Sequence, residues 1–130
     1  MDFTEGLTMN AYKGFKFWHM KNKEFTDIWK IYKDITEELM SETIIARVSF
    51  KNVEIYACLE KGEGNEYITI FTTICKDGEW QTEDFFNDEE ERNNKIKKAL
   101  SKQKWIVIQQ IMFDLLVDYC EEKKIVIEEI

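Results

Sequence analysis

The hydrophobic and polar positions change their spacing along the chain, and these changes divide it into predicted elements. In Lys23–Ser41 apolar residues recur at helical spacing and charged residues occupy the opposite face, which predicts an amphipathic helix. From Ile44 to Thr82 the spacing becomes two, as in half-buried strands. From Asp88 onward the helical spacing returns. The order of the patterns predicts a helix, then a sheet, then further helices.

The stretch with a period of two is interpreted as a four-stranded antiparallel meander, because each connection is short. Its predicted strands are Ile44–Phe50, Val53–Leu59, Glu66–Lys76 and Glu79–Thr82. The turn and loop signals between them are Lys51-Asn52, Gly62–Asn65 and Asp77-Gly78. If the second of these closes a simple hairpin, Cys58 lies opposite Thr69. Cys58 and Cys75 are therefore not predicted to be cross-strand partners.

Two helices are predicted after the sheet. Asn87 is a suitable N-cap for the first helix, since Glu90 stands three residues later, as in a capping box. The second helix, Lys104–Lys124, has an apolar arc that covers about half of its circumference. The apolar positions of the two helices are out of phase. The chain is therefore predicted to break at Ser101–Lys104.

The second of these helices has a polar edge opposite its apolar arc. The edge consists of Gln110, Asp114, Asp118 and Glu121. Gln109 falls inside the apolar arc, so it is predicted to be buried and to hydrogen-bond the backbone. The alternative is that Gln109 points into a ligand cavity.

The predicted elements define an α+β fold. It consists of an amphipathic N-terminal helix, a four-stranded antiparallel β-meander and a C-terminal helix pair packing on the sheet. Two further stretches are compatible with strands. Ala11–Met20 would place Phe15 and Phe17 on one side of a strand with Lys16 and Trp18 on the other, although Gly14 weakens that pattern. Ile125–Ile130 is short and rich in β-branched residues.

The composition predicts a single globular domain that spans residues 1–130. Hydrophobic residues make up 44% of the chain and aromatic residues 14%, which excludes an intrinsically disordered chain. No membrane span is predicted, and the N-terminus lacks the basic and apolar regions of a signal peptide. Cys58, Cys75 and Cys120 lie in apolar segments and are interpreted as reduced core thiols. These features predict a cytoplasmic protein.

The formal net charge of −8 argues against direct nucleic-acid binding, because lysine and arginine neutralise phosphates in such complexes. The expected partners are basic or apolar surfaces. Of the 18 basic residues only Arg47 and Arg92 are arginines, and proline is absent. We interpret this usage as the codon bias of an AT-rich genome, which favours a bacterial or phage origin.

The segment Glu83–Arg92 is the part of the sequence that most suggests a function. It contains six carboxylates, and aromatic residues lie beside them, an arrangement typical of interface hot spots. The predicted partner-binding residues are Trp80, Glu83, Asp84, Phe85, Phe86, Asp88, Glu89, Glu90 and Glu91, with Asp114, Asp118 and Glu121 as a secondary acidic edge. The alternative is that the acids cap a helix and keep the protein soluble, while Phe85 or Phe86 turns inward.

Catalytic and cofactor chemistry has little support in the sequence. His19 is the single histidine, so a zinc site or a histidine-dependent nucleophile would need it; we interpret it as a packing or surface residue. Asp114 and Asp118 stand one helical turn apart and could bind a divalent cation or act as paired carboxylates in acid/base chemistry, but we interpret them as part of an exposed helix face. The glycine-rich phosphate loops and the nucleophile elbow are missing from the sequence. No enzyme activity, cofactor or metal is therefore predicted.

Three functional hypotheses follow. The leading one is a small acidic inhibitory module that binds a basic protein partner, such as a nuclease or other nucleic-acid enzyme, and occludes its basic surface. The second is an acidic homodimeric chaperone or scaffold that buries excess apolar helix surface between two copies. The third is a small-molecule-binding domain or enzyme with a pocket between the sheet and the last helix, near Gln109, Tyr119 and His19.

Overall fold

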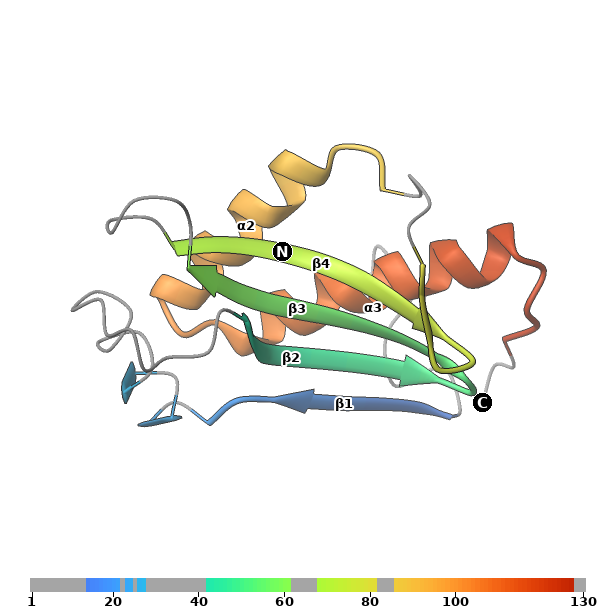
Figure 1. The fold of residues 1–130 in the computed structure, drawn as a ribbon, viewed down its shortest axis with the longest axis horizontal. Coiled ribbons are helices and arrows are strands. Elements are labelled where there is room, and N and C mark those ends of the chain that lie inside the picture. Colours follow the sequence, from blue (N-terminus) through green and yellow to red (C-terminus); the bar gives the residue numbers. More distant parts are fainter. Residues whose placement is uncertain are drawn as a thin grey trace.

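The computed structural model describes residues 14–21, 23–24, 26–27, 42–61, 68–81 and 86–127. In this part of the chain five strands form one antiparallel sheet in the order β1-β2-β3-β4-β5, and two helices cover one of its faces (Figure 1). The elements are β1 (Phe15–His19), β2 (Glu42–Phe50), β3 (Val53–Lys61), β4 (Ile68–Lys76), β5 (Glu79–Gln81), α2 (Glu89–Ser101) and α3 (Trp105–Glu122). The α+β class and the C-terminal helix pair on an antiparallel sheet are confirmed.

In the described residues the sheet has five strands instead of the predicted four, because Phe15–His19 pairs with β2. Phe15 stands opposite Phe50, and their rings stack with centroids 4.6 Å apart. Gly14 precedes the strand and has a φ of 88°, where a side chain would be strained and a Cβ atom would come within 3.3 Å of the Phe50 ring. The glycine that weakens the pattern in the sequence therefore lets this strand pack on its neighbour.

An N-terminal helix is not established in the described residues. Within the predicted helix, Lys23–Ser41, residues 23–24 and 26–27 are helical. The remaining residues of that segment lie outside the described part of the chain. The helix therefore stays a prediction.

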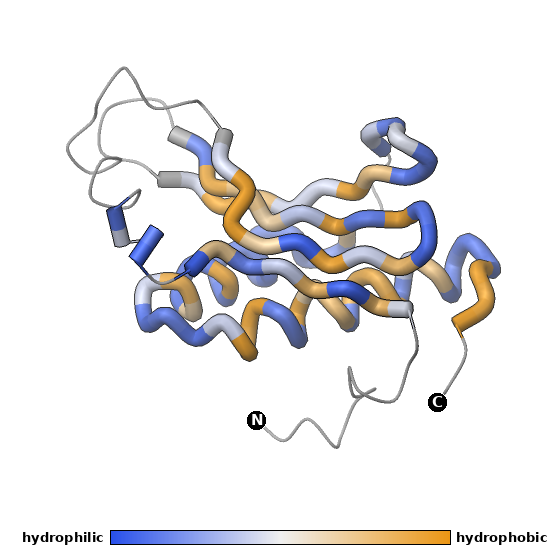
Figure 2. Tube along the Cα trace, turned by 90° about the horizontal axis from the view of Figure 1, so that it is seen from below, coloured by the Kyte–Doolittle hydropathy of each residue, from blue (hydrophilic) through white to orange (hydrophobic). Residues whose placement is uncertain are grey.

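The face of the sheet that packs against α2 and α3 carries the apolar residues at every second position. On β3 these are Val53, Ile55, Ala57 and Leu59, all fully buried. Figure 2 shows this alternation of hydrophobic and hydrophilic positions along the strands. Both predicted two-residue turns, Lys51-Asn52 and Asp77-Gly78, are present. Asp77 and Gly78 have φ values of 53° and 79°, as the favoured hairpin turn requires.

A bulge in β2 interrupts the predicted alternation. The register with β3 shifts between Ile44 and Ala46, so that Ile45 is an extra residue in the ladder. Ile45 is fully buried, whereas Ile44 is 41% exposed. The prediction that Ile44 and Ile45 continue the alternation of β2 is therefore wrong, because the bulge reverses which side of the sheet each one faces.

The register of β3 and β4 also differs from the prediction. Cys58 pairs with Phe71 and not with Thr69, because residues 62–67, rather than Gly62–Asn65, connect these strands. Cys75 pairs with Glu54, so the two strand cysteines are not cross-strand partners, as predicted. Cys58, Cys75 and Cys120 are free thiols. Burial raises the pKa of the Cys120 thiol to about 11.

The predicted break between the C-terminal helices is confirmed at residues 102–104. The start of α2 differs from the prediction. Its N-cap position is Asp88, which has a φ of 55° and makes no capping hydrogen bond through its side chain, so the predicted capping by Asn87 is wrong. At the end of α3 the amide of Ile125 donates to the carbonyl oxygen of Cys120 (2.8 Å). Residues 125–127 form no strand, and residues 128–130 lie outside the described part of the chain.

The two adjacent glutamines of α3 lie in different surroundings from those predicted. Gln110, assigned to the polar edge, is 4% exposed. Gln109, assigned to the buried arc, is half-buried and hydrogen-bonds the Nδ1 atom of His19 (3.1 Å). The prediction for each is wrong because α3 packs against both the sheet and α2, so that its buried surface is wider than one arc. No helix in the described residues is long and apolar enough to cross a membrane.

Candidate functional site

Acidic residues from α2 and α3 line the two sides of one groove. Asp88 and Glu91 come from the N-cap position and the first turn of α2, and Asp114 and Asp118 come from the second half of α3. These residues and their neighbours line an open cavity of about 390 Å³. Carboxylates that are 23 or more positions apart in the sequence are brought together because the two helices pack side by side on the sheet.

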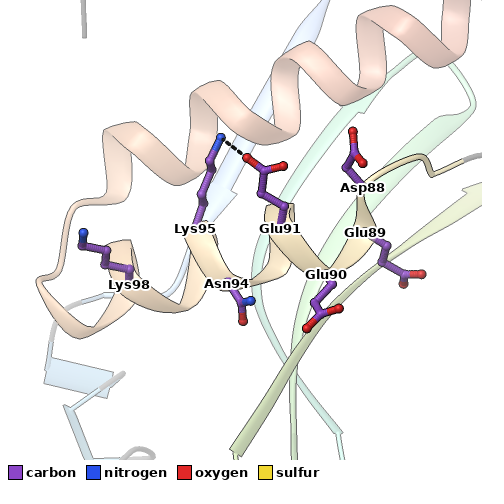
Figure 3. Close-up of a pocket in the computed structure, with 7 residues that line it drawn as sticks. All are labelled: Asp88, Glu89, Glu90, Glu91, Asn94, Lys95 and Lys98. Atoms are coloured by element: carbon purple, nitrogen blue, oxygen red, sulfur yellow. Dashed lines mark ion pairs between the residues drawn. The ribbon is translucent and has the colours of Figure 1, made fainter.

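The side chains of the first turns of α2 separate into two groups. Figure 3 shows Asp88, Glu91 and Lys95 on the side of the helix that faces α3, while Glu90 and Asn94 point away. Glu91 and Lys95 form an ion pair of 3.2 Å, in which both side chains are largely exposed. Such a pair contributes little to stability, so its carboxylate can exchange partners at small cost.

The groove continues past Lys95 into a second cavity of about 460 Å³. The two cavities share Lys95, Ile111 and Asp114. The second cavity is lined on its rim by Lys98, Lys102 and Lys104, and on its floor by Ala99 and Val107. We call the joined cavities the α2–α3 groove, with an acidic half at Asp88, Glu91, Asp114 and Asp118 and a lysine half at Lys98, Lys102 and Lys104.

Arg92 lies in the acidic half, but its side chain contacts residues of the fold and is not directed at the groove. Its guanidinium donates two hydrogen bonds to the buried Oγ1 atom of Thr72 on β4, at 3.1 and 2.7 Å. It also lies over the Phe86 ring, 4.2 Å from the centroid. Burial lowers the pKa of Arg92, and the charge of Glu89 opposes this shift. The contacts with Thr72 and Phe86 turn this cation toward the sheet, and the carboxylates of the groove face solvent.

The pKa values of the two α3 aspartates in the groove, Asp114 and Asp118, are raised. Burial is the largest cause for Asp114; the Gln110 amide, which donates to Asp114 at 2.8 Å, lowers its pKa, and the charge of Asp118 raises it. Burial is also the largest cause for Asp118, followed by the charge of Glu121. Both carboxylates are therefore destabilised in their charged form, and a cation that enters the groove would relieve this.

Replacing Asp114 and Asp118 together by asparagine is expected to raise the free energy of unfolding at pH 7. A carboxyl group whose pKa is raised in the folded state costs stability as the pH rises through that pKa, and the asparagines remove this cost. Near pH 3 both aspartates are largely protonated in the folded and in the unfolded state. The variant and the wild type should therefore have the same free energy of unfolding at that pH. The gain should stay below about 1 kcal/mol, because solvent screens these charges.

Urea denaturation at the two pH values measures this gain. The matched control is Glu122→Gln, which removes an exposed carboxylate of the same helix outside the groove. An equal gain at both pH values would contradict the assignment of the effect to ionisation.

The structure does not bring all the predicted partner-binding residues together. Trp80 is 58% exposed and lies beside Tyr56, with ring centroids 5.2 Å apart, on the face of the sheet opposite α2 and α3. Phe86 turns inward and packs against the core, which is the alternative that the sequence left open. Glu89, Glu90 and Glu121 are exposed, but none of them lines the acidic half of the groove. Glu83, Asp84 and Phe85 lie outside the described residues.

Sequence reasoning missed the lysine half of the groove. Lys95, Lys98 and Lys102 recur at helical spacing, which places them on one face of α2. This spacing of the lysines is visible in the sequence. It does not by itself indicate a cavity, however, because Val107 and Ile111 form the apolar floor only when α3 packs against α2.

The residues around His19 contact one another. Gln109 hydrogen-bonds the histidine, and the imidazole stacks on the Trp105 ring with centroids 4.9 Å apart. Tyr119 is fully buried in the core. The cavities described above lie on the other side of α3, between α3 and α2.

In the residues that the structure describes, no group of three or more histidine, cysteine, aspartate or glutamate side chains is placed to hold a metal ion. Comparisons of the chain with protein-family models, with curated proteins and with solved structures found no match.

Proposed function

We propose that this protein is a non-enzymatic binding module that holds a basic segment of a partner protein in the acidic half of the α2–α3 groove. The observation that carries the proposal is the convergence of Asp88 and Glu91 with Asp114 and Asp118 across the groove. By binding there it would occlude a basic surface of the partner, such as the nucleic-acid-binding surface of a nuclease.

The electrostatics favour a basic ligand at this position. The nearby cations, Arg92 and Lys95, are engaged with Thr72 and with Glu91 respectively. A lysine or arginine of a partner would lower the raised pKa values of Asp114 and Asp118. Binding should therefore weaken as the pH falls through those values. It should also weaken in salt, because exposed charges are screened.

The lysine half restricts which basic segment fits. Lys98, Lys102 and Lys104 would repel a uniformly basic peptide, while Val107 and Ile111 offer an apolar floor. The preferred ligand is therefore an amphipathic helix with basic residues at one end and apolar residues along its length, bound between the helices as in other helix-in-groove complexes.

A designed peptide tests the proposal. The probe is a fluorescent helix of about 16 residues with leucines along one face and lysines at one end. The variant Asp88→Asn with Asp114→Asn removes one carboxylate from each wall. Asparagine tolerates the left-handed backbone of residue 88 and still accepts the hydrogen bond from Gln110. We expect the variant to weaken binding about tenfold at low salt, measured by fluorescence anisotropy.

The matched control is Glu79→Gln with Glu122→Gln, which makes the same change in net charge at exposed positions outside the groove. It should bind like the wild type. Equal weakening in the two variants would mean that the peptide responds only to net charge, and the proposal would fail. The acidic and lysine halves are complementary in charge, so two copies could bind each other through their grooves. Light scattering on the same samples tests for such a dimer. A stable dimer that blocks the peptide would also contradict the proposal.

A further inference from the structure

The face of the sheet opposite the helices carries a second polar cavity, of about 520 Å³. It is lined by Lys16, Trp18, Arg47, Ser49, Lys51 and Glu54, among others. Trp18 pairs with Arg47 across β1 and β2, and Lys16 pairs with Ser49, so these side chains share the outer face. The volume lies within the range of small-molecule sites. We call this cavity the outer-face pocket.

The outer-face pocket is basic in a protein that is acidic overall. Among the described residues that line it, the charged side chains are Lys16, Arg47 and Lys51 and one carboxylate, Glu54. Glu54 accepts a hydrogen bond from the Tyr56 hydroxyl, and the Nζ atom of Lys51 donates to the carbonyl oxygen of Val126 at 3.2 Å. Lys16 and Arg47 are therefore the lining cations whose side chains no described residue engages.

The two arginines of the chain have different roles. Arg92 is committed to Thr72 and Phe86. Arg47 is exposed, and its side chain makes no hydrogen bond or ion pair with the described residues. A guanidinium presents a planar set of donors that matches a phosphate, and it lies here directly opposite an indole that is 42% exposed.

From this arrangement we infer that the outer-face pocket binds a nucleoside monophosphate. The base stacks on the Trp18 indole, and the phosphate is held by Arg47 and Lys16. A phosphate ion alone would leave the exposed indole uncovered. A base can stack on an aromatic side chain whatever its identity, because every base has a flat π-face. A long polyanion fits less well, because the net charge of −8 repels each added phosphate.

Titration with adenosine 5′-monophosphate tests the inference. Amide shifts in a ¹H–¹⁵N NMR spectrum of the unmodified protein should saturate below about 10 mM and should be largest around Trp18 and Arg47. Adenosine alone and inorganic phosphate alone should each bind at least about tenfold more weakly. Arg47→Gln should weaken binding about tenfold and Trp18→Leu about fivefold, whereas Lys97→Gln, an exposed cation on α2, should change nothing.

Three results would overturn the inference. The first is no saturable shift with the nucleotide, and the second is inorganic phosphate that binds as tightly as the nucleotide. The third is a thymidine octanucleotide that binds more tightly, with shifts that extend over β3 to β5, which would assign this face to single-stranded nucleic acid. The groove variant Asp88→Asn with Asp114→Asn should bind the nucleotide normally, so this test stands apart from that of the proposed function.

Discussion

Replacing Phe113 by alanine is expected to lower the free energy of unfolding by about 3–5 kcal/mol, the usual cost of removing a fully buried phenyl ring. Phe113 on α3 is fully buried. Its ring lies 4.9 Å from that of Phe15 and 6.1 Å from that of Phe17, measured between centroids. It therefore holds β1, which among the described strands pairs only with β2, against the helix layer. Alanine would remove both of these ring contacts between α3 and β1.

Urea denaturation measures this loss, and amide hydrogen exchange shows where it falls. Two control variants separate the loss of stability caused by the cavity from the loss caused by any substitution in α3. Ile106→Ala removes a side chain that is 49% exposed on the same helix and should cost less than about 1 kcal/mol. Phe113→Leu fills most of the space and should cost less than the alanine variant. If the amides of β1 kept their protection in Phe113→Ala, the assigned role of Phe113 would be wrong.

The strands and the C-terminal helices could be predicted because their signals are local. The turns Lys51-Asn52 and Asp77-Gly78 lie between runs of alternating residues, and each signal spans only a few positions. The break at residues 102–104 was visible because a helix cannot keep two apolar phases on one straight axis. Such features depend on the backbone preferences of neighbouring residues, which a single sequence records.

The errors arise where distant segments decide the outcome. The surroundings of Gln109 and Gln110 depend on α2, which packs against α3 beside the sheet, and a projection of one helix does not contain its neighbours. The bulge at Ile45 has no marker in the sequence such as glycine, and the strand patterns on either side look continuous. Tertiary packing therefore overrides the local pattern at both places.

The candidate site was predictable in part for the same reason. The acids of the first turn of α2 and the acids of α3 are each visible as local clusters, but their meeting across the α2–α3 groove is a property of helix packing. Trp80 is close to the acidic segment in sequence, yet the strand direction places it on the other face of the sheet beside Tyr56. Proximity in sequence is a poor guide where a strand and a helix meet.

Replacing Arg92 by alanine is expected to lower the free energy of unfolding by about 1.5–3 kcal/mol, the range for hydrogen bonds that involve a charged group. Arg92 links α2 to β4 by its two hydrogen bonds to Thr72, whose side chain is buried. Alanine would leave the Thr72 hydroxyl buried without this donor, and it would also remove the guanidinium from the Phe86 ring. The loss should therefore exceed that of any exposed cation on the same helix.

The matched control is Lys95→Ala, which breaks only the exposed ion pair with Glu91 and should cost about 0–0.5 kcal/mol. A double-mutant cycle with Thr72→Val then isolates the hydrogen bonds from the ring contact. If Arg92 acts through Thr72, alanine should cost less in the valine background, with a coupling free energy of about 1 kcal/mol. Arg92→Lys keeps the charge but loses the planar pair of donors, so it should recover only part of the stability. Simple additivity in the cycle would show that Arg92 stabilises the fold through Phe86 alone, and the polar link between α2 and β4 would then carry no free energy.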